Sequence, residues 1–258
     1  MTLFFTRNEV ALMMKRNTPI PLVFLAAATL LLVSCTTKAP PPEIDVPIVQ
    51  GWLPSYDSLI KSEVTQEMLA VSPTRIKDFC PNWNKLDQGQ KEDFYADFVQ
   101  AVAWTESGYD SASMYVEDKL GKDPVTGQNV VSEGLMQLSY QDKLQYGKAC
   151  DFNFSKDREA FLEDLEAHNK GALRSKHLHR EILNPQRNLT CAMSIMQKLL
   201  TSSDKPLPQV FAPYWSTVDA KHPKKYSRFL TKLKEAGTVC DLPVPPAPTP
   251  TPAPALTQ

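Results

Sequence analysis

The sequence predicts a mainly α-helical single domain, and three observations support this prediction. Apolar residues recur every three or four positions in several separate stretches, which is the spacing of an amphipathic helix. The chain has 258 residues, of which 42% are hydrophobic and 22% charged, enough to form one core. Both ends of the chain are rich in proline, so the folded part is expected over residues 56–242.

The first expected helix has the strongest local signal. Asp87 is followed three residues later by Gln90, which resembles a capping box. A buried stripe then follows, formed by Phe94, Phe98 and Val102. Further helices are expected over residues 134–147, 155–168, 189–200 and 224–236, and the last of these stops at Gly237.

Residues 110–133 are expected to form a loop rather than a helix. The turn-forming residues of 123–127 lie at its centre. A short β-hairpin can form over residues 125–131. The fold class is therefore mainly α with a small β-hairpin.

The amino terminus has the pattern of an export signal. Lys15 and Arg16 precede an apolar run over residues 20–33, which is short for a membrane-spanning helix. The run ends in Leu-Val-Ser-Cys at Cys35, which resembles a bacterial lipobox in which Cys35 carries the lipid. Residues 1–34 are then a signal peptide. Thr36 after the cysteine favours the outer membrane, at its periplasmic face, over the inner membrane, and a secreted protein is the other outcome. An uncleaved anchor, or a signal cut elsewhere, is the alternative interpretation.

The remaining segments outside the core are interpreted from composition. Residues 35–55 form a proline-rich tether, and residues 243–258 form a disordered proline-rich tail. A net charge of −1 gives no field that attracts nucleic acid. We expect a monomer with no cofactor and no metal ion.

Four cysteines follow Cys35, and an even number in an exported chain indicates disulfides. Three connectivities are possible, and free buried thiols are the alternative. We favour Cys150 with Cys191, and Cys80 with Cys240. The second bridge ties together the two ends of the folded domain.

Two short segments carry the functional signal: residues 104–109 (Trp-Thr-Glu-Ser-Gly-Tyr) and 132–139 (Ser-Glu-Gly-Leu-Met-Gln-Leu-Ser). The first places Glu106 at the end of an apolar helix. A carboxyl group held against apolar walls keeps its proton near neutral pH, because desolvation disfavours its charged form. Such a group can protonate a leaving oxygen, as glycoside cleavage requires.

The two segments resemble the Glu-Ser and Gly-Leu-Met-Gln motifs of the soluble lytic transglycosylase and goose-type lysozyme superfamily. The resemblance covers roughly residues 85–236 and implies a lysozyme-like fold with peptidoglycan glycan strands as the substrate. It implies that Glu106 is the general acid and base. The residues it implies in substrate binding are Ser107, Tyr115, Met136, Gln137, Asn188, Tyr214 and Trp215.

Some of these assignments have alternatives. Asn188 is equally well a plain helix cap. By the resemblance Tyr214 hydrogen-bonds the catalytic carboxyl, with Tyr226 in reserve. Trp215 stacks on a sugar ring or packs in the core.

The reaction type depends on a second carboxylate. A lytic transglycosylase needs one carboxyl for both proton transfers, whereas an inverting hydrolase needs a second one to activate water. The candidates are Glu133 and Asp123, with Glu117 and Asp118 in the same loop. Glu133 is expected to point into solvent. A lytic transglycosylase is the first interpretation, lysozyme-type hydrolysis the second, and a non-catalytic wall-binding lipoprotein the third.

The basic stretch over residues 221–225 has two interpretations. It contacts anionic wall polymers, or it is a solvated helix entrance, and the second is favoured.

Overall fold

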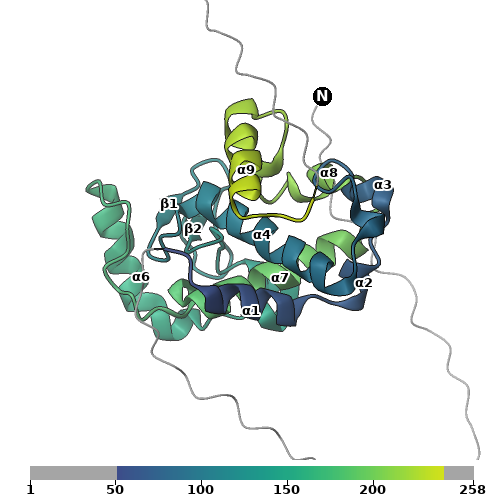
Figure 1. Ribbon diagram of the computed structural model, residues 1–258. Coiled ribbons are helices and arrows are strands. Elements are labelled where there is room, and N and C mark those ends of the chain that lie inside the picture. Colours follow the sequence, from purple (N-terminus) through teal and green to yellow (C-terminus); the bar gives the residue numbers. More distant parts are fainter. Residues whose placement is uncertain (1–50, 241–258) are drawn as a thin grey trace, which may run out of the picture. The chain divides into compact units, whose positions relative to one another are not determined.

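A computed structural model of the chain describes residues 51–240, which form a mainly helical fold with a small sheet at one side (Figure 1). The expected signal peptide, the lipidation of Cys35, the proline-rich tail and most of the tether lie outside the described residues. Within residues 51–240, no helix is both long enough and apolar enough to cross a membrane.

The long helix α4 (Gln88–Ser107) is the central element (Figure 1). The predicted capping box is confirmed: the Asp87 side chain accepts from the Gln90 backbone, and the Gln90 side chain accepts from the Asp87 backbone. Short elements precede it, namely α1 (Pro54–Glu63), α2 (Gln66–Leu69), α3 (Pro73–Ile76) and the 3-10 turn η1 (Trp83–Lys85). The predicted stripe is buried, and Phe98 packs edge-on against Phe79 and Phe229.

A two-stranded antiparallel sheet follows α4. Strand β1 (Met114–Val116) pairs with β2 (Val131–Glu133) in the register Met114 with Glu133 and Val116 with Val131. A hairpin is therefore present, but its strands flank residues 117–130, and only Val131 falls within the expected range of 125–131. Asp123 explains the difference, because its carboxylate accepts from the backbone of Val125 at 2.7 Å and holds that segment as a turn.

The predicted helix over residues 134–147 is wrong for its first half. Only α5 (Asp142–Tyr146) and the 3-10 turn η2 (Gly147–Cys150) are helical. Gly134 has φ +77° and Gln137 has φ +51°, and a right-handed helix excludes such left-handed angles. A bridge between Glu133 and Leu138 closes the segment as a tight turn instead.

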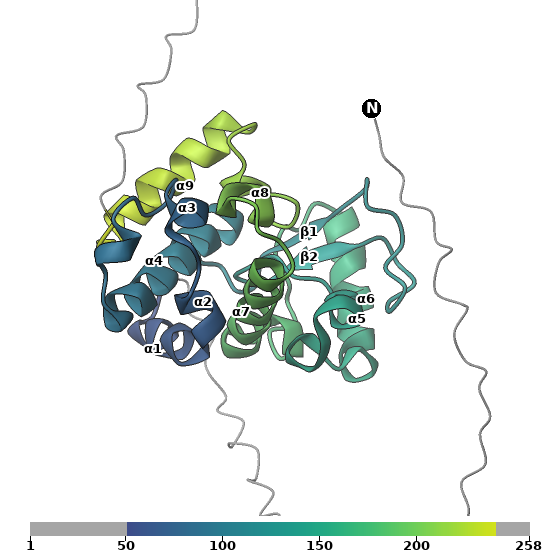
Figure 2. The same ribbon diagram turned by 90° about the vertical axis from the view of Figure 1, so that its right-hand side faces the viewer.

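The second half of the chain supplies the other helices: α6 (Phe154–Asn169), α7 (Pro185–Thr201), α8 (Leu207–Phe211) and α9 (Pro223–Glu235), with 3-10 turns η3 (Glu181–Leu183) and η4 (Ser216–Val218). Asn153 and Asn184 cap α6 and α7 through their side chains. Helix α7 lies between α1, α4 and α9 on one side and the sheet with α5 and α6 on the other (Figure 2).

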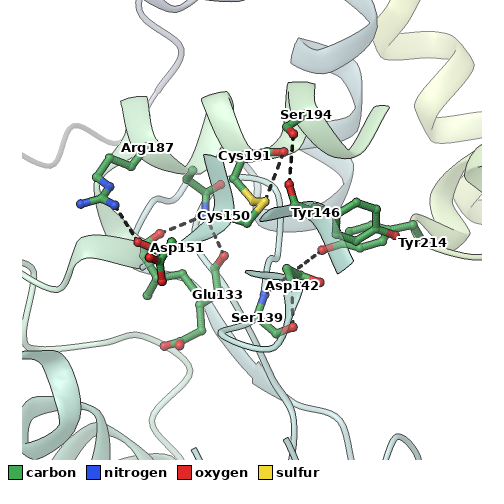
Figure 3. The surroundings of a disulfide bond; sticks show 12 residues. Glu133, Ser139, Asp142, Tyr146, Cys150, Asp151, Arg187, Cys191, Ser194 and Tyr214 are labelled. Carbon is green, nitrogen blue, oxygen red and sulfur yellow. Dashed lines mark hydrogen bonds between the residues drawn. A yellow bond between two sulfur atoms is a disulfide. The ribbon is translucent and has the colours of Figure 1, made fainter. Parts of the chain in front are cut away.

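Both favoured disulfides are formed, Cys80 with Cys240 and Cys150 with Cys191. The first closes a separation of 160 residues and joins the segment that follows α3 to the end of the described residues. The second joins η2 to α7 beside the turn that follows β2 (Figure 3).

Candidate active site

Glu106 lies in the last turn of α4, which ends at Gly108 in the left-handed conformation. Burial is the main reason that the pKa of Glu106 rises from 4.5 to about 7. The charge of Glu117 raises this pKa further, whereas the charge of Lys225 and a hydrogen bond from the Thr217 backbone lower it. Within the described part of the chain, the Oε1 atom of Glu106 is buried without a hydrogen-bond partner. The carboxyl therefore holds its proton up to near neutral pH, and its buried Oε1 receives no hydrogen bond from the described residues that would stabilise the charged form.

The side chain of Glu106 lines a groove formed by two adjoining cavities. The cavity that contains Glu106 has a volume of about 620 Å³, and its neighbour about 360 Å³. Both are lined by Glu117, Ser132, Gln137 and Tyr214, so they are two parts of one groove. The first part also contains charged side chains, those of Asp118, Lys119 and Lys225. The second part is mostly uncharged, with Gln141, Gln145 and Tyr146. Two connected cavities have room for a ligand that extends from one into the other.

The turn after β2 brings Gln137 into the groove. Its side-chain amide donates to the carbonyl of Gly134 at 2.9 Å, which fixes its direction. Gln137 lines both parts of the groove, as expected of a substrate-binding residue. Tyr115 lies in the groove as well, and 56% of it is exposed.

Asn188 supports this turn from within the core and does not reach the groove. It is fully buried, and its Oδ1 accepts from the backbone of Met136 at 2.9 Å. Its Nδ2 donates to the carbonyls of Glu133 and Ile182. The expectation that Asn188 binds substrate is wrong, and so is the alternative that it caps a helix, because Asn184 caps α7.

Met136 and Trp215 are also placed differently from expectation. Met136 is fully buried, so it does not line the groove. Trp215 forms part of the groove wall but is 1% exposed, and its indole donates to the carbonyl of Met136 at 3.0 Å. A ring buried to this extent offers no face for a sugar to stack on.

Tyr214 lines the groove but bonds a different carboxyl from the one expected. Its hydroxyl donates to Oδ2 of Asp142 at 2.6 Å, and the backbone N–H of Ser139 donates to the same oxygen (Figure 3). The predicted bond from Tyr214 to Glu106 is therefore replaced by one to Asp142. The reserve candidate, Tyr226, lines a separate cavity. Ser107 donates its hydroxyl to the carbonyl of Ala103 at 2.9 Å and does not line the groove.

Both favoured second carboxylates lie outside the groove. Glu133 is fully buried and pairs with Arg180, which is also fully buried and lies 3.1 Å from Asp164. The expectation that Glu133 points into solvent is therefore wrong. Asp123 is 1% exposed, and its oxygens accept backbone hydrogen bonds that hold its own turn and Gln141.

Glu117 is the acid of this loop that the structure brings into the groove with Glu106. It lines both parts, and the Ser132 hydroxyl donates to its Oε1 at 3.0 Å. Asp118 lines the part that contains Glu106.

The sequence carried no signal that several residues belong to the groove, among them Lys225 and Asp142. Lys225 was assigned to a solvated helix entrance, yet it lines the cavity that holds Glu106. Asp142, which holds Tyr214, gave no sequence signal because its partner lies 72 residues away.

Comparison with known proteins shows the fold of this chain. No family model matches the chain, and no curated protein matches it. Two solved structures of Bd0314 DslA are similar at 20% sequence identity. The wild-type form has a TM-score of 0.53 and the match covers 72% of this chain and 91% of that one. A variant with one glutamate replaced by glutamine has a TM-score of 0.52, with 71% and 90% covered. At this identity the likeness shows a shared, mainly helical fold.

Proposed function

We propose that this protein cleaves the β-1,4 bond between N-acetylmuramic acid and N-acetylglucosamine in peptidoglycan strands. The observation that carries the proposal is the buried carboxyl of Glu106, with a pKa of about 7, in a groove of two connected cavities. A protonated carboxyl at neutral pH can donate its proton to the glycosidic oxygen as the bond to the anomeric carbon breaks.

In the first form of the reaction, Glu106 performs both proton transfers. After it has protonated the leaving oxygen, its carboxylate takes the proton of the C6 hydroxyl of the same muramoyl unit. The C6 oxygen then bonds to the anomeric carbon and gives a 1,6-anhydro product, without consuming water. The protein is then a lytic transglycosylase, and Glu106 ends the cycle protonated.

The position of Glu117 favours a second form, lysozyme-type hydrolysis. Glu117 lies in the groove with Glu106, where its carboxylate can take a proton from an attacking water. The hydroxyl of that water bonds to the anomeric carbon and gives a reducing end. The bond from Ser132 to Glu117 holds the carboxylate in one orientation.

The place of action follows from the same proposal. We propose an exported bacterial lipoprotein, anchored through Cys35 at the periplasmic face of the outer membrane or secreted, that acts on the wall as a monomer. The two disulfides support an oxidising compartment outside the cytoplasm.

Analysis of the product ends tests the proposal and separates its two forms. Purified protein is incubated with peptidoglycan, and the soluble fragments are analysed by mass spectrometry beside Glu106→Gln and Glu117→Gln. Anhydromuramoyl ends that persist in Glu117→Gln indicate a lytic transglycosylase. Reducing ends that disappear in Glu117→Gln indicate a hydrolase. Binding to peptidoglycan without any soluble fragments would establish the non-catalytic alternative.

A further inference from the structure

Helix α9 carries Lys224 at the edge of a basic flank whose other members are Lys225, Arg228 and Lys232, and these last three are here called the α9 basic stripe. With 3.6 residues per turn, these positions lie within about 60° of one another around the helix. Lys234 is also exposed but lies about 180° from Lys225. The buried residues Phe229 and Leu233 face the core between the two flanks.

The stripe begins inside the groove. Lys225 lines the cavity that contains Glu106, and its ammonium donates to the Ser216 hydroxyl at 3.1 Å. Arg228 follows one turn further along α9, which packs beside α4 (Figure 1). The stripe therefore runs from the groove at Lys225 along the surface of α9, outside the groove.

Trp104 holds the next two cations of the stripe in place. The Arg228 guanidinium lies 5.0 Å, and the Lys232 ammonium 4.4 Å, from the centre of the Trp104 ring. Trp104 stands two residues before Glu106 on α4, so the stripe is fixed relative to the acid. Side chains that are already ordered lose less entropy when they bind a ligand.

The charge of the stripe is only partly compensated. Lys232 pairs with Glu235. Within residues 51–240, neither Lys225 nor Arg228 has a carboxylate close enough for an ion pair. Two exposed cations, Lys225 in the cavity with Glu106 and Arg228 over the Trp104 ring, therefore remain available to an anionic ligand.

We propose that the α9 basic stripe binds the carboxylates of the stem peptides on a glycan strand as the strand leaves the groove. This inference rests on the proposed function and identifies the part of the substrate that the charged end of the groove selects. A membrane surface fits less well, because the apolar residues of α9 are buried in the core and none is free to enter a bilayer.

The test compares charge reversal on the two flanks of α9. Arg228→Glu and its matched control Lys234→Glu are each made in full-length protein that carries Glu106→Gln, so that binding is measured without cleavage. The probes are insoluble peptidoglycan with free stem-peptide carboxylates, the same material after its carboxyls have been amidated, and anionic lipid vesicles. We expect Arg228→Glu to bind the carboxylate form about five- to tenfold more weakly than Lys234→Glu at low salt. We expect the difference to vanish at high salt and on the amidated form.

Three results would overturn the inference: equal binding of the two variants to the carboxylate form, an equal loss on both forms, or a difference seen only with anionic lipid vesicles. Cleavage by the protein with intact Glu106 is measured in parallel. Absence of cleavage together with the expected binding difference overturns the proposed function and supports the stripe as a site for carboxylates. Cleavage without the binding difference overturns the inference that the stripe binds carboxylates, and it supports the proposed function.

Discussion

The side chain of Asn188 accepts a hydrogen bond from the backbone N–H of Met136 at 2.9 Å. Its amide nitrogen also donates to the carbonyl of Glu133, so one buried side chain of α7 holds the turn on both sides of Gly134. Gln137 stands on this turn and faces the groove. The position of a groove residue therefore depends on a contact in the core.

We expect Gly134→Ala to destabilise the fold by on the order of 2–4 kcal/mol, because it adds a steric clash to backbone strain. Gly134 has φ +77°, and a Cβ there would lie 2.5 Å from Nδ2 of Asn188 and 3.1 Å from the carbonyl of Ile182. Gly127→Ala is the matched control, since Gly127 has φ +72° but no atom within 4 Å of an added Cβ. Urea denaturation of both variants measures the difference. Equal destabilisation of the two variants would show that the Asn188 side chain does not exclude a Cβ atom at position 134.

We expect cleavage to fall as the pH rises through about 7, because Glu106 must hold its proton to act as an acid. Lys225→Gln removes a charge that lowers the pKa of Glu106, so the falling limb should move to higher pH. Initial rates between about pH 5 and pH 9, on glycan strands freed of their stem peptides, provide the measurement. Lys234→Gln, on the other flank of α9, should leave the midpoint unchanged. A midpoint that does not move in Lys225→Gln contradicts the assignment of this limb to Glu106.

We expect Glu106→Gln to be more stable than the wild type at pH 8. The pKa of Glu106 is about 7 in the folded state and near 4.5 when the chain is unfolded. The folded state therefore loses stability as the pH rises from 4.5 to 7, and the glutamine variant escapes a loss of on the order of 1–3 kcal/mol. Thermal unfolding at pH 4 should show little difference between the two proteins. A gain that is as large at pH 4 as at pH 8 would assign the effect to packing instead of ionisation.

Local signals in the sequence predicted much of the fold. The capping box at Asp87 and the stripe through Phe98 depend on residues close together in the chain, and both are present. The leucines of residues 134–147 also have helical spacing. The helix that they predict over residues 134–140 does not form, because left-handed backbone angles at Gly134 and Gln137 bend the chain into a turn.

The sequence predicted only those site residues whose position is set by their own segment of the chain. Glu106 and Gln137 reach the groove from their own motifs. The burial of Glu133 depends on Arg180, which lies 47 residues away, and no pattern around Glu133 indicates that ion pair. Lys225 belongs to a basic run that is typical of a solvated surface, and only the packing of α9 beside α4 brings it into the groove.

The central claim is that Glu106 is the acid that cleaves the glycan strand, and its most direct test is the initial cleavage rate of Glu106→Gln at pH 6 on intact peptidoglycan. Glutamine keeps the size and polarity of the side chain but has no acidic proton to give. We expect the rate to fall by about 10²–10⁴-fold while binding to the strands persists. A variant that cleaves as fast as the wild type would contradict the claim and remove Glu106 from the reaction.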